Sequence, residues 1–469
     1  MKYTQKMDYP SSYELYGEFD VYPSAPPAPK KNKNYHESYD GYKDKKYPPA
    51  PKEPPFNDRG VIYTDGQKEL FRDALNWWQG SHSQPYVYSG KAGTGKTTVA
   101  RKLIDLFDLK LSEVMCVALS GKAVTLLASK GLYARTIHSL IYNTGYENIL
   151  DENGDVIMDT NGHPKSKFVF KLRPELNRFW KDRLKLIIVD ELSMVNDNIM
   201  KDLLSFKVPV IGMGDLNQLP PVYGISSYML KPNYVLNQIM RQEADSPVIQ
   251  IANNILDYKP LIYGDYPNDC HIVKSVPLDV SLLRNYDVIL TSTNSSRDLL
   301  NNYIRKNVIH LNSPLPMYGD KIICRQNDWN NQSDGMFLTN GTIGYIDMVN
   351  EEGAKKNTMS INFIPDYGID SKAIFRTDLD TSYITAPYID RKAWGIGSRT
   401  ALKFEYGYAI TVHLSQGSQY NRVLYFDEPF GGGKEMTKHL RYTAVSRAIT
   451  SITICTTPPA YLIPRLKNT

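Results

Sequence analysis

The stretch at 86–107 constrains the fold of this chain more than any other segment. It contains the pattern Gly90-x-x-x-x-Gly95-Lys96-Thr97, which follows a short apolar run and precedes a segment with helical periodicity. Glycines at these positions let backbone N–H groups close around phosphate oxygens, and the N-terminus of the next helix adds positive potential. The pattern therefore predicts a strand, a phosphate-binding loop and a helix.

Two acidic residues follow a second apolar strand. Asp190 and Glu191 come directly after the run at 184–189, and ligands bind at the carboxyl ends of strands in open parallel sheets. Lys96 would reach the β- and γ-phosphates of a bound nucleotide, and Mg²⁺ would be held by the Thr97 hydroxyl and the Asp190 carboxylate. Glu191 would orient or deprotonate the attacking water. The predicted cradle consists of Gly90, Ala92, Gly93, Thr94, Gly95, Lys96, Thr97 and Thr98.

Three later side chains indicate that this site has a second half. Gln218, Arg241 and Arg447 lie far along the chain, and the segment at 442–448 would present Arg447 from another lobe. An arginine offered to the γ-phosphate from a second domain stabilises the transition state and couples lobe closure to hydrolysis. For any single arginine, a solvated helix face is the alternative.

The order of elements predicts an α/β fold with two lobes, each carrying an insertion. Strands alternate with helices, which favours parallel sheets. The turn signals Asn153-Gly154 and Asn161-Gly162 predict an inserted β-hairpin, and short alternating strands predict a small β-barrel. The predicted division is a disordered Tyr/Pro/Lys-rich tail at 1–56, lobe 1A at 57–222 with its insert 1B at about 143–180, lobe 2A at 223–311 and 405–469, and insert 2B at 312–404.

The composition limits the classes of protein to which this chain can belong. The formal charge of +5 permits nucleic-acid binding without arguing for it. The four cysteines form no CxxC pair, which favours reduced core residues in a cytoplasmic protein. The sequence contains no run of about 18 apolar residues, which is the length needed to span a membrane. The N-terminus lacks the apolar core of a signal peptide. We therefore expect a cytoplasmic location, which would be the host cytoplasm for a phage protein.

The motifs in this order resemble those of superfamily 1 helicases, most closely the type B group that contains the phage Dda helicase and the RecD-like helicases. The resemblance covers about residues 60 to 455 and includes a long match, Gly214-Asp-Leu-Asn-Gln-Leu-Pro-Pro221. The matching segments lie at 90–97, 136–139, 189–193, 214–221, 240–242, 411–417 and 442–448.

The resemblance implies ATP bound between two RecA-like lobes, with single-stranded DNA across both and movement from 5′ to 3′. Gln67 would recognise adenine, and Gln218, Arg241 and Arg447 would contact ATP. The hairpin insert would correspond to the pin domain that splits the duplex, and the second insert to an SH3-like domain. The implied contacts to the DNA backbone are Lys122, His138, Thr293, Asn294, His413, Ser415 and Gln416.

We therefore expect an ATP-dependent DNA helicase that unwinds duplex DNA in replication, recombination or repair. Its expected partners are single-stranded and forked DNA, and we expect a monomer. Two roles stay open for the tail at 1–56: docking of a replication protein and a passive tail. Three alternatives stay open: an RNA helicase, a translocase that does not unwind, and a recruitment factor that ATP switches. The motifs do not separate these, because the lobes of such motors mostly contact the phosphate backbone.

Overall fold

The computed structural model describes most of the chain from residue 61 to residue 463. The described ranges are 61–151, 154–158, 164, 166–176, 178–221, 224–239, 246–333, 336–350, 357–366, 373–387 and 401–463. The predicted tail at 1–56 lies outside these ranges, as do Arg241 and the turn residues Asn153, Asn161 and Gly162.

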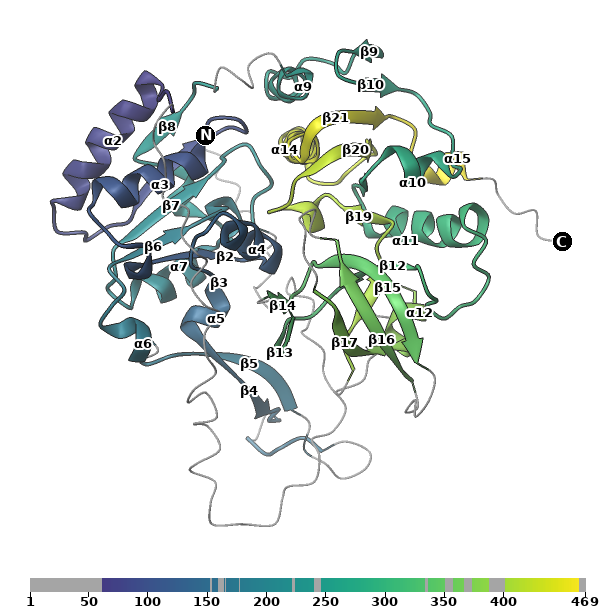
Figure 1. Ribbon diagram of the computed structural model, residues 1–469, viewed down its shortest axis with the longest axis horizontal. Coiled ribbons are helices and arrows are strands. Elements are labelled where there is room, and N and C mark those ends of the chain that lie inside the picture. Colours follow the sequence, from purple (N-terminus) through teal and green to yellow (C-terminus); the bar gives the residue numbers. More distant parts are fainter. Residues whose placement is uncertain are drawn as a thin grey trace, which may run out of the picture.

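Lobe 1 is built on a six-stranded parallel sheet with the order β3-β2-β6-β7-β1-β8 (Figure 1). Its strands are β1 (Tyr86–Gly90), β2 (Val114–Ala118), β3 (Ala134–Thr136), β6 (Leu186–Val189), β7 (Val210–Gly214) and β8 (Tyr234–Leu236). Successive side chains of β6 enter different cores: Leu186 and Ile188 join one, and Ile187 and Val189 the other. Both faces of the sheet are therefore covered, which explains why these strands are continuous apolar runs.

Helices cover the two faces of this sheet. They are α2 (Asp65–Trp78), α3 (Lys96–Leu106), α4 (Gly121–Ser129), α5 (Ile137–Ile141), α6 (Arg178–Lys181), α7 (Asp197–Leu204) and α8 (Ser227–Leu230), with short turns η1 (Leu111–Glu113) and η2 (Leu192–Met194). Leu70 of α2 and Leu103 of α3 pack in one core, while Ile137 of α5 and Met200 of α7 pack in the other. The P-loop strand is thus fixed in the middle of the lobe.

The boundary of lobe 1 differs from the predicted end at 222. β8 pairs in parallel with β1, with Tyr88 opposite Tyr234, and Met229 of α8 is buried in a lobe 1 core. Residues 227–236 therefore belong to lobe 1, because β8 covers the edge of β1 that would otherwise expose unpaired backbone groups.

Lobe 2 holds a second six-stranded sheet, with the order β19-β11-β20-β21-β10-β9. Only its edge strand β9 runs antiparallel to its neighbour, β10. The strands are β9 (Gly264–Tyr266), β10 (Cys270–Val273), β11 (Val288–Thr291), β19 (Ala409–Thr411), β20 (Tyr420–Phe426) and β21 (Ala448–Cys455). The helices are α9 (Pro247–Leu256), α10 (Ser281–Asn285), α11 (Asn294–Tyr303), α14 (Gly433–Val445) and α15 (Pro459–Leu462), with turns η3 (Ile304–Val308) and η4 (His413–Ser415).

A small antiparallel sheet is inserted between β11 and β19 and lies beside lobe 2 (Figure 1). Its order is β17-β16-β15-β12-β18, and its two edges meet where Leu379 of β17 bridges Leu402, just before β18. The elements are β12 (Lys321–Cys324), β15 (Ile343–Asn350), β16 (Thr358–Pro365), β17 (Phe375–Asp380), α12 (Thr381–Thr385) and β18 (Phe404–Tyr406), with a separate pair β13 (Asp328–Ser333) and β14 (Met336–Leu338). The sheet therefore continues to Tyr406, just past the predicted limit at 404.

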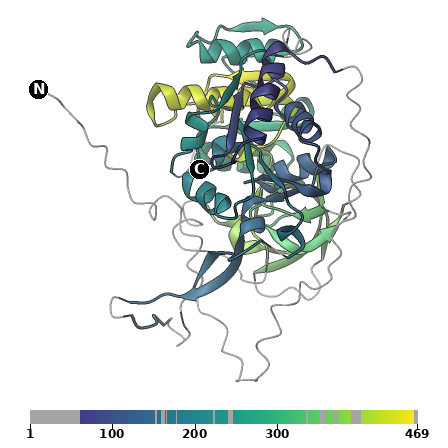
Figure 2. The same cartoon turned by 90° about the vertical axis from the view of Figure 1, so that its left-hand side faces the viewer.

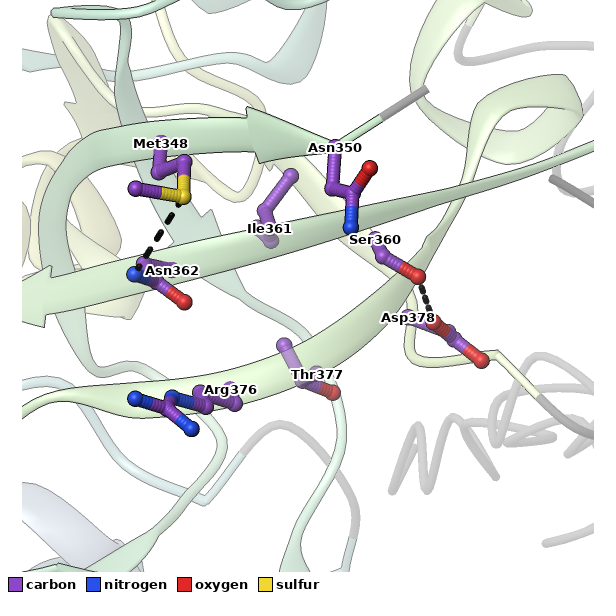
Figure 3. Close-up of a pocket in the computed structure, with 8 residues that line it drawn as sticks. All are labelled: Met348, Asn350, Ser360, Ile361, Asn362, Arg376, Thr377 and Asp378. Carbon is purple, nitrogen blue, oxygen red and sulfur yellow. Dashed lines mark hydrogen bonds between the residues drawn. The ribbon is translucent and has the colours of Figure 1, made fainter. Parts of the chain in front are cut away.

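The small sheet carries a hollow of about 560 Å³ on β15, β16 and β17 (Figure 3). Its polar side chains partly bond one another, since Ser360 donates to Asp378. Arg376 and Asn362 also line it. None of the residues that line the hollow belongs to the site described below.

A two-stranded ribbon is inserted in lobe 1 after α5. β4 (Tyr142–Asn148) and β5 (Ser166–Leu172) pair antiparallel over their whole length. Figure 2 shows the ribbon projecting away from the body of the lobe.

Two further predictions can be compared with the structure. The four cysteines are buried and free, as predicted. None of the helices in the described ranges has the length and apolar character needed to cross a membrane.

Candidate active site

The loop between β1 and α3 takes the conformation that its glycines allow. Gly93 and Gly95 have φ angles of 80° and 77°, in the left-handed region that favours glycine. A Cβ atom on Gly90 would lie 2.4 Å from Oγ1 of Thr94, so a larger residue does not fit at the end of β1. Backbone N–H groups and the N-terminus of α3 therefore form a cradle suited to an anion.

The side chain of Lys96 lies over this loop. Its Nζ donates to the carbonyl oxygen of Gly90 at 2.7 Å and to that of Lys91 at 3.2 Å. Thr97 and Thr98 follow in the first turn of α3 and remain partly exposed. A phosphate held by the loop would therefore be within reach of the ammonium group.

Gln67 joins α2 to the P-loop. Its side chain is buried, and Nε2 donates to the carbonyl oxygen of Thr94 at 3.0 Å. Its Oε1 accepts from the backbone N–H of Thr64 at 3.0 Å, which completes a capping box at the start of α2. These contacts fix the helix against the loop, and the recognition of adenine by Gln67 stays a prediction.

Asp190 follows β6 at the carboxyl edge of the sheet. Its Oδ1 accepts from the N–H of Glu191 at 2.9 Å. Part of the side chain remains accessible, but the surrounding protein disfavours its charge, and the charge of Glu191 acts in the same direction. Together they raise the pKa of Asp190 to about 6, although the charge of Lys96 opposes the shift.

Glu191 faces an arginine from the other lobe. Its backbone is left-handed, with φ of 49°, and its Oε1 lies 3.9 Å from Nη1 of Arg447. Arg447 is buried just beyond α14, and its guanidinium donates to the carbonyl oxygens of Thr443 and Ser418, both at 3.1 Å. The arginine is thus held by its own lobe and directed at the acidic pair of lobe 1.

Two acceptors at this junction have no hydrogen-bond partner among the described residues. They are Oε2 of Glu191 and Oε1 of Gln218, both buried at the atom level. A buried acceptor without a donor is costly, so such atoms commonly bind water or a ligand. Each of the two atoms is therefore available to accept a hydrogen bond from water or from a ligand.

Helix α14 of lobe 2 supplies further contacts to lobe 1. The hydroxyl of Tyr442 donates to Oδ2 of Asp215 at 2.5 Å and accepts from the P-loop N–H of Ala92 at 3.0 Å. Oγ1 of Thr443 accepts from the N–H of Leu219 at 2.9 Å. The candidate site is therefore closed by both lobes.

A second inter-lobe contact surrounds Lys122, near the start of α4. Its Nζ donates to the hydroxyl of Tyr420 at 2.9 Å and lies 4.2 Å from the centroid of that ring. Thr339 of the small-sheet insert packs against Gly121, where a Cβ atom would lie 2.2 Å away. This lysine is therefore engaged with lobe 2 in the arrangement seen here.

The two histidines predicted to contact DNA lie in aromatic surroundings. The ring of His138 lies 4.9 Å from that of Phe170 and 5.4 Å from that of Tyr142, at the base of the ribbon. The ring of His413 lies 5.9 Å from that of Phe430. Burial lowers the pKa of both histidines, which favours neutral rings near pH 7.

The remaining predicted DNA contacts differ in their exposure. Thr293 accepts from the N–H of Ser296 and caps α11, which begins at Asn294. Ser415 and Gln416 are buried, and their side chains donate to the carbonyl oxygens of Val412 and Leu219. In this arrangement the last two side chains face protein, so their contact with DNA stays a prediction.

Comparison with known proteins agrees with this two-lobed site. Residues 62–260 match the family model of an AAA domain, and residues 406–455 match that of the UvrD-like helicase C-terminal domain. The chain is 26% identical over 392 residues to the ATP-dependent RecD2 DNA helicase of Deinococcus radiodurans. The aligned region covers 77% of this chain and 45% of that protein. It is 25% identical over 419 residues to the ATP-dependent DNA helicase Pif1 of Campylobacter jejuni. That aligned region covers 77% of this chain and 86% of the Pif1 chain. These matches support a superfamily 1 helicase.

The fold has a counterpart among solved structures. A structure of two Pif1 helicases coordinating at forked double-stranded DNA has a TM-score of 0.50 and 18% identity, covering 86% of this chain and 95% of that one. This likeness shows the fold: the two lobes are RecA-like. The chain spans less than half the length of the RecD2 relative.

The residues predicted to hold Mg²⁺ have suitable chemistry. Thr97 offers a hydroxyl and Asp190 a carboxylate, and Mg²⁺ typically combines one or two carboxylates with phosphate oxygens and water. Within the described ranges no group of three or more His, Cys, Asp or Glu side chains could hold a metal ion. The donor set therefore fits a metal that shares its coordination with a nucleotide.

The structure brings the predicted residues of the ATP site together except Arg241, which lies outside the described residues. Sequence reasoning gave no individual role to Tyr442 or Asp215, although both lie inside matched segments. No signal in a single sequence distinguishes a tyrosine that crosses between lobes from one in a core. The contacts of Lys91 with Asn253 of α9 (3.3 Å) and of His439 with the carbonyl of Asn217 (2.7 Å) were also not foreseen.

Proposed function

We propose that this chain is an ATP-dependent DNA helicase, in which ATP hydrolysis between the lobes drives movement along single-stranded DNA. The observation that carries the proposal is the approach of Arg447 from lobe 2 to Glu191 of lobe 1. A hydrolytic site shared by two lobes changes when they separate, so each turnover can be converted into relative motion.

The side chains have separate roles in this proposal. Lys96 and the loop N–H groups bind phosphate, Gln218 and Glu191 hold the attacking water, and Arg447 stabilises charge on the transferred phosphoryl group. Mg²⁺, when bound by Thr97 and Asp190, would neutralise charge on the phosphate oxygens. Arg241 is proposed as a second phosphate ligand, and Gln67 as the contact to adenine.

DNA is proposed as the track because the RecD2 and Pif1 relatives are named DNA helicases. Movement from 5′ to 3′ rests on the motif resemblance alone. The ribbon of β4 and β5 is proposed as the pin that separates strands, which its projection from lobe 1 supports (Figure 2). The small sheet is proposed as an SH3-like guide for DNA, which the meeting of its edges at Leu379 and Leu402 supports.

The proposed contacts to the DNA backbone comprise one lysine, two histidines and four polar residues. They are Lys122, His138, Thr293, Asn294, His413, Ser415 and Gln416. Lys122 contacts Tyr420 of lobe 2, and the ring of His138 lies beside that of Phe170 in the ribbon. Neutral imidazoles can donate one N–H to phosphate.

An unwinding assay with matched tails tests the function directly. The full chain is given the same duplex with a 5′ tail, a 3′ tail or no tail, made of DNA or RNA. We expect ATP-dependent unwinding of the 5′-tailed DNA only. Unwinding of the 3′-tailed duplex alone would contradict the direction, and preference for RNA tails would contradict the choice of nucleic acid.

A second comparison tests the proposals on residues 1–56 and on oligomeric state. The full chain and a variant lacking this segment are assayed for unwinding, and their masses are measured by light scattering. We propose that both are monomers with equal activity and that the segment docks a replication protein. Loss of unwinding in the shortened chain would instead assign the segment to the motor.

A further inference from the structure

The side chain of Tyr442 starts in lobe 2 and ends between two elements of lobe 1. The ring is 1% exposed and belongs to the core of lobe 2, while the hydroxyl contacts Asp215 and Ala92. Asp215 is fully buried at the end of β7, and Ala92 is in the P-loop. One hydroxyl group therefore links the helix α14, the segment after β7 and the phosphate cradle.

The direction of these two hydrogen bonds is fixed by chemistry. An ionised carboxylate only accepts, so the single proton of the Tyr442 hydroxyl goes to Asp215. A lone pair of the hydroxyl oxygen is then left for the N–H of Ala92. Burial, together with the charge of Asp215, raises the pKa of Tyr442 well above its usual value, so the phenol stays protonated over the working pH range.

Asp215 is itself held in place. Its Oδ1 accepts from the backbone N–H of Asn217 at 3.0 Å and from the amide Nδ2 of the same residue at 3.1 Å. The adjacent helix residue, Thr443, binds the N–H of Leu219 at 2.9 Å. Neighbouring residues of α14 thus hold the two ends of the segment 215–219, which contains Gln218.

The contact with Ala92 has a consequence for the cradle. Backbone N–H groups of a P-loop are the donors that bind phosphate oxygens. One of them here is bonded to a side chain of lobe 2, so the loop conformation at Ala92 depends on the distance between the lobes. Two equilibria linked in this way affect each other equally: lobe approach changes nucleotide affinity, and nucleotide binding changes lobe approach.

We propose that Tyr442 is the positioning residue through which lobe 2 sets the conformation of the P-loop, so that lobe approach and nucleotide affinity are coupled. This rests on the proposed function, in that the nucleotide is ATP and the lobes move. Tyr442 acts through Ala92 and Asp215 and needs no contact with the nucleotide itself.

The test is Tyr442→Phe, which removes the hydroxyl and keeps the ring in its core. A matched control is Tyr425→Phe: Tyr425 is also fully buried in lobe 2, but its hydroxyl bonds Ser292 and Asp427 of the same lobe. Binding of a fluorescent ATP analogue with Mg²⁺ is measured with and without oligo(dT), together with KM and kcat for ATP.

We expect Tyr442→Phe to raise the KM for ATP and the Kd of the analogue about tenfold or more in the presence of oligo(dT), as loss of a hydrogen bond to a charged group predicts. The effect of oligo(dT) on nucleotide affinity should shrink by a similar factor. Tyr425→Phe should leave these ratios unchanged. Equal Kd and KM in the wild-type protein and in Tyr442→Phe would overturn the proposal, as would equal changes in the two variants.

Hydrogen exchange gives a second readout that does not require turnover. Peptides covering Lys91–Gly95 should exchange faster in Tyr442→Phe than in the wild-type protein, and Tyr425→Phe should match the wild type. Unchanged exchange would contradict the contact with Ala92. If the wild-type protein binds nucleotide but does not unwind DNA, the helicase function fails while the Kd and exchange measurements still decide the role of Tyr442.

Discussion

Nη1 of Arg447 lies 3.9 Å from Oε1 of Glu191, across the boundary between the two lobes. The arginine is buried and bonded to carbonyl oxygens of its own lobe, so its charge is placed before any ligand binds. Glu191 in turn has a second oxygen without a hydrogen-bond partner among the described residues. The pair therefore combines a fixed cation from one lobe with a free acceptor from the other.

Replacing Arg447 by alanine should slow ATP hydrolysis strongly while ATP still binds. An arginine finger raises kcat by a factor of about 10³–10⁵, so we expect kcat to fall by a factor of at least about 10³. Steady-state hydrolysis and nucleotide binding are measured in parallel. Arg422→Ala, on the exposed end of β20, is the control and should retain activity; equal turnover in the two variants would show that Arg447 is no finger.

Lys96→Ala should abolish hydrolysis because it removes a charge that binds phosphate. It removes the ammonium group that lies over Gly90 and Lys91, and with it the positive charge opposite the β- and γ-phosphates. Hydrolysis should fall below detection, while affinity for oligo(dT) changes little. Lys201→Ala, on the exposed side of α7, serves as the control. Retained hydrolysis in Lys96→Ala would remove the basis for the P-loop assignment.

Asp190→Asn should stabilise the fold while removing activity. In the folded protein the pKa of Asp190 is raised to about 6 from 3.8, so its charged form costs stability above pH 6. The shift corresponds to roughly 2–3 kcal/mol. Because the folded pKa is the higher one, the wild type regains stability as pH falls from about 6 towards 3.8.

Urea unfolding of the wild type and of Asp190→Asn at several pH values measures this effect. The variant should be more stable than the wild type at pH 8, and the difference should shrink steadily between pH 6 and pH 4. A difference that does not vary with pH would mean that burial of the Asp190 charge is not its cause. Hydrolysis by the variant should be lost at every pH, because an amide is a poorer ligand for Mg²⁺.

The parts of the site that sequence analysis anticipated are those set by local chemistry. Gly93 and Gly95 are needed for their left-handed backbone, and Asp190 ends a continuous apolar strand. Such features depend on residues close in sequence. The alternation of strands and helices likewise indicates two parallel-sheet lobes without any knowledge of contacts between them.

The parts that were missed depend on tertiary pairing. β8 is only three residues long, and its place in lobe 1 is set by hydrogen bonds to β1. Tyr442 is one of 34 tyrosines, so residue type alone could not single it out. Ser415 and Gln416 match a motif in sequence, but whether they face protein or a ligand depends on how η4 packs against lobe 1.

The contact between Gly121 and Thr339 makes a prediction about the second insertion. A Cβ atom on Gly121 would lie 2.2 Å from both Cβ and Oγ1 of Thr339, a distance that real contacts do not reach. Thr339 is buried, and its hydroxyl shares a hydrogen bond with Thr342 at 3.1 Å, so it cannot simply rotate away. Gly121→Ala should therefore push the small-sheet insert away from the start of α4, beside Lys122.

We expect Gly121→Ala to weaken binding of oligo(dT) and reduce unwinding several-fold, while nucleotide affinity without DNA stays near that of the wild type. The decisive comparison is the double variant Gly121→Ala/Thr339→Gly, in which the new methyl group meets empty space. It should recover most of the lost DNA affinity, because the clash is removed and the insert can return. If the double variant is no better than Gly121→Ala, the loss comes from the backbone of α4, and contact with the insert does not set DNA affinity.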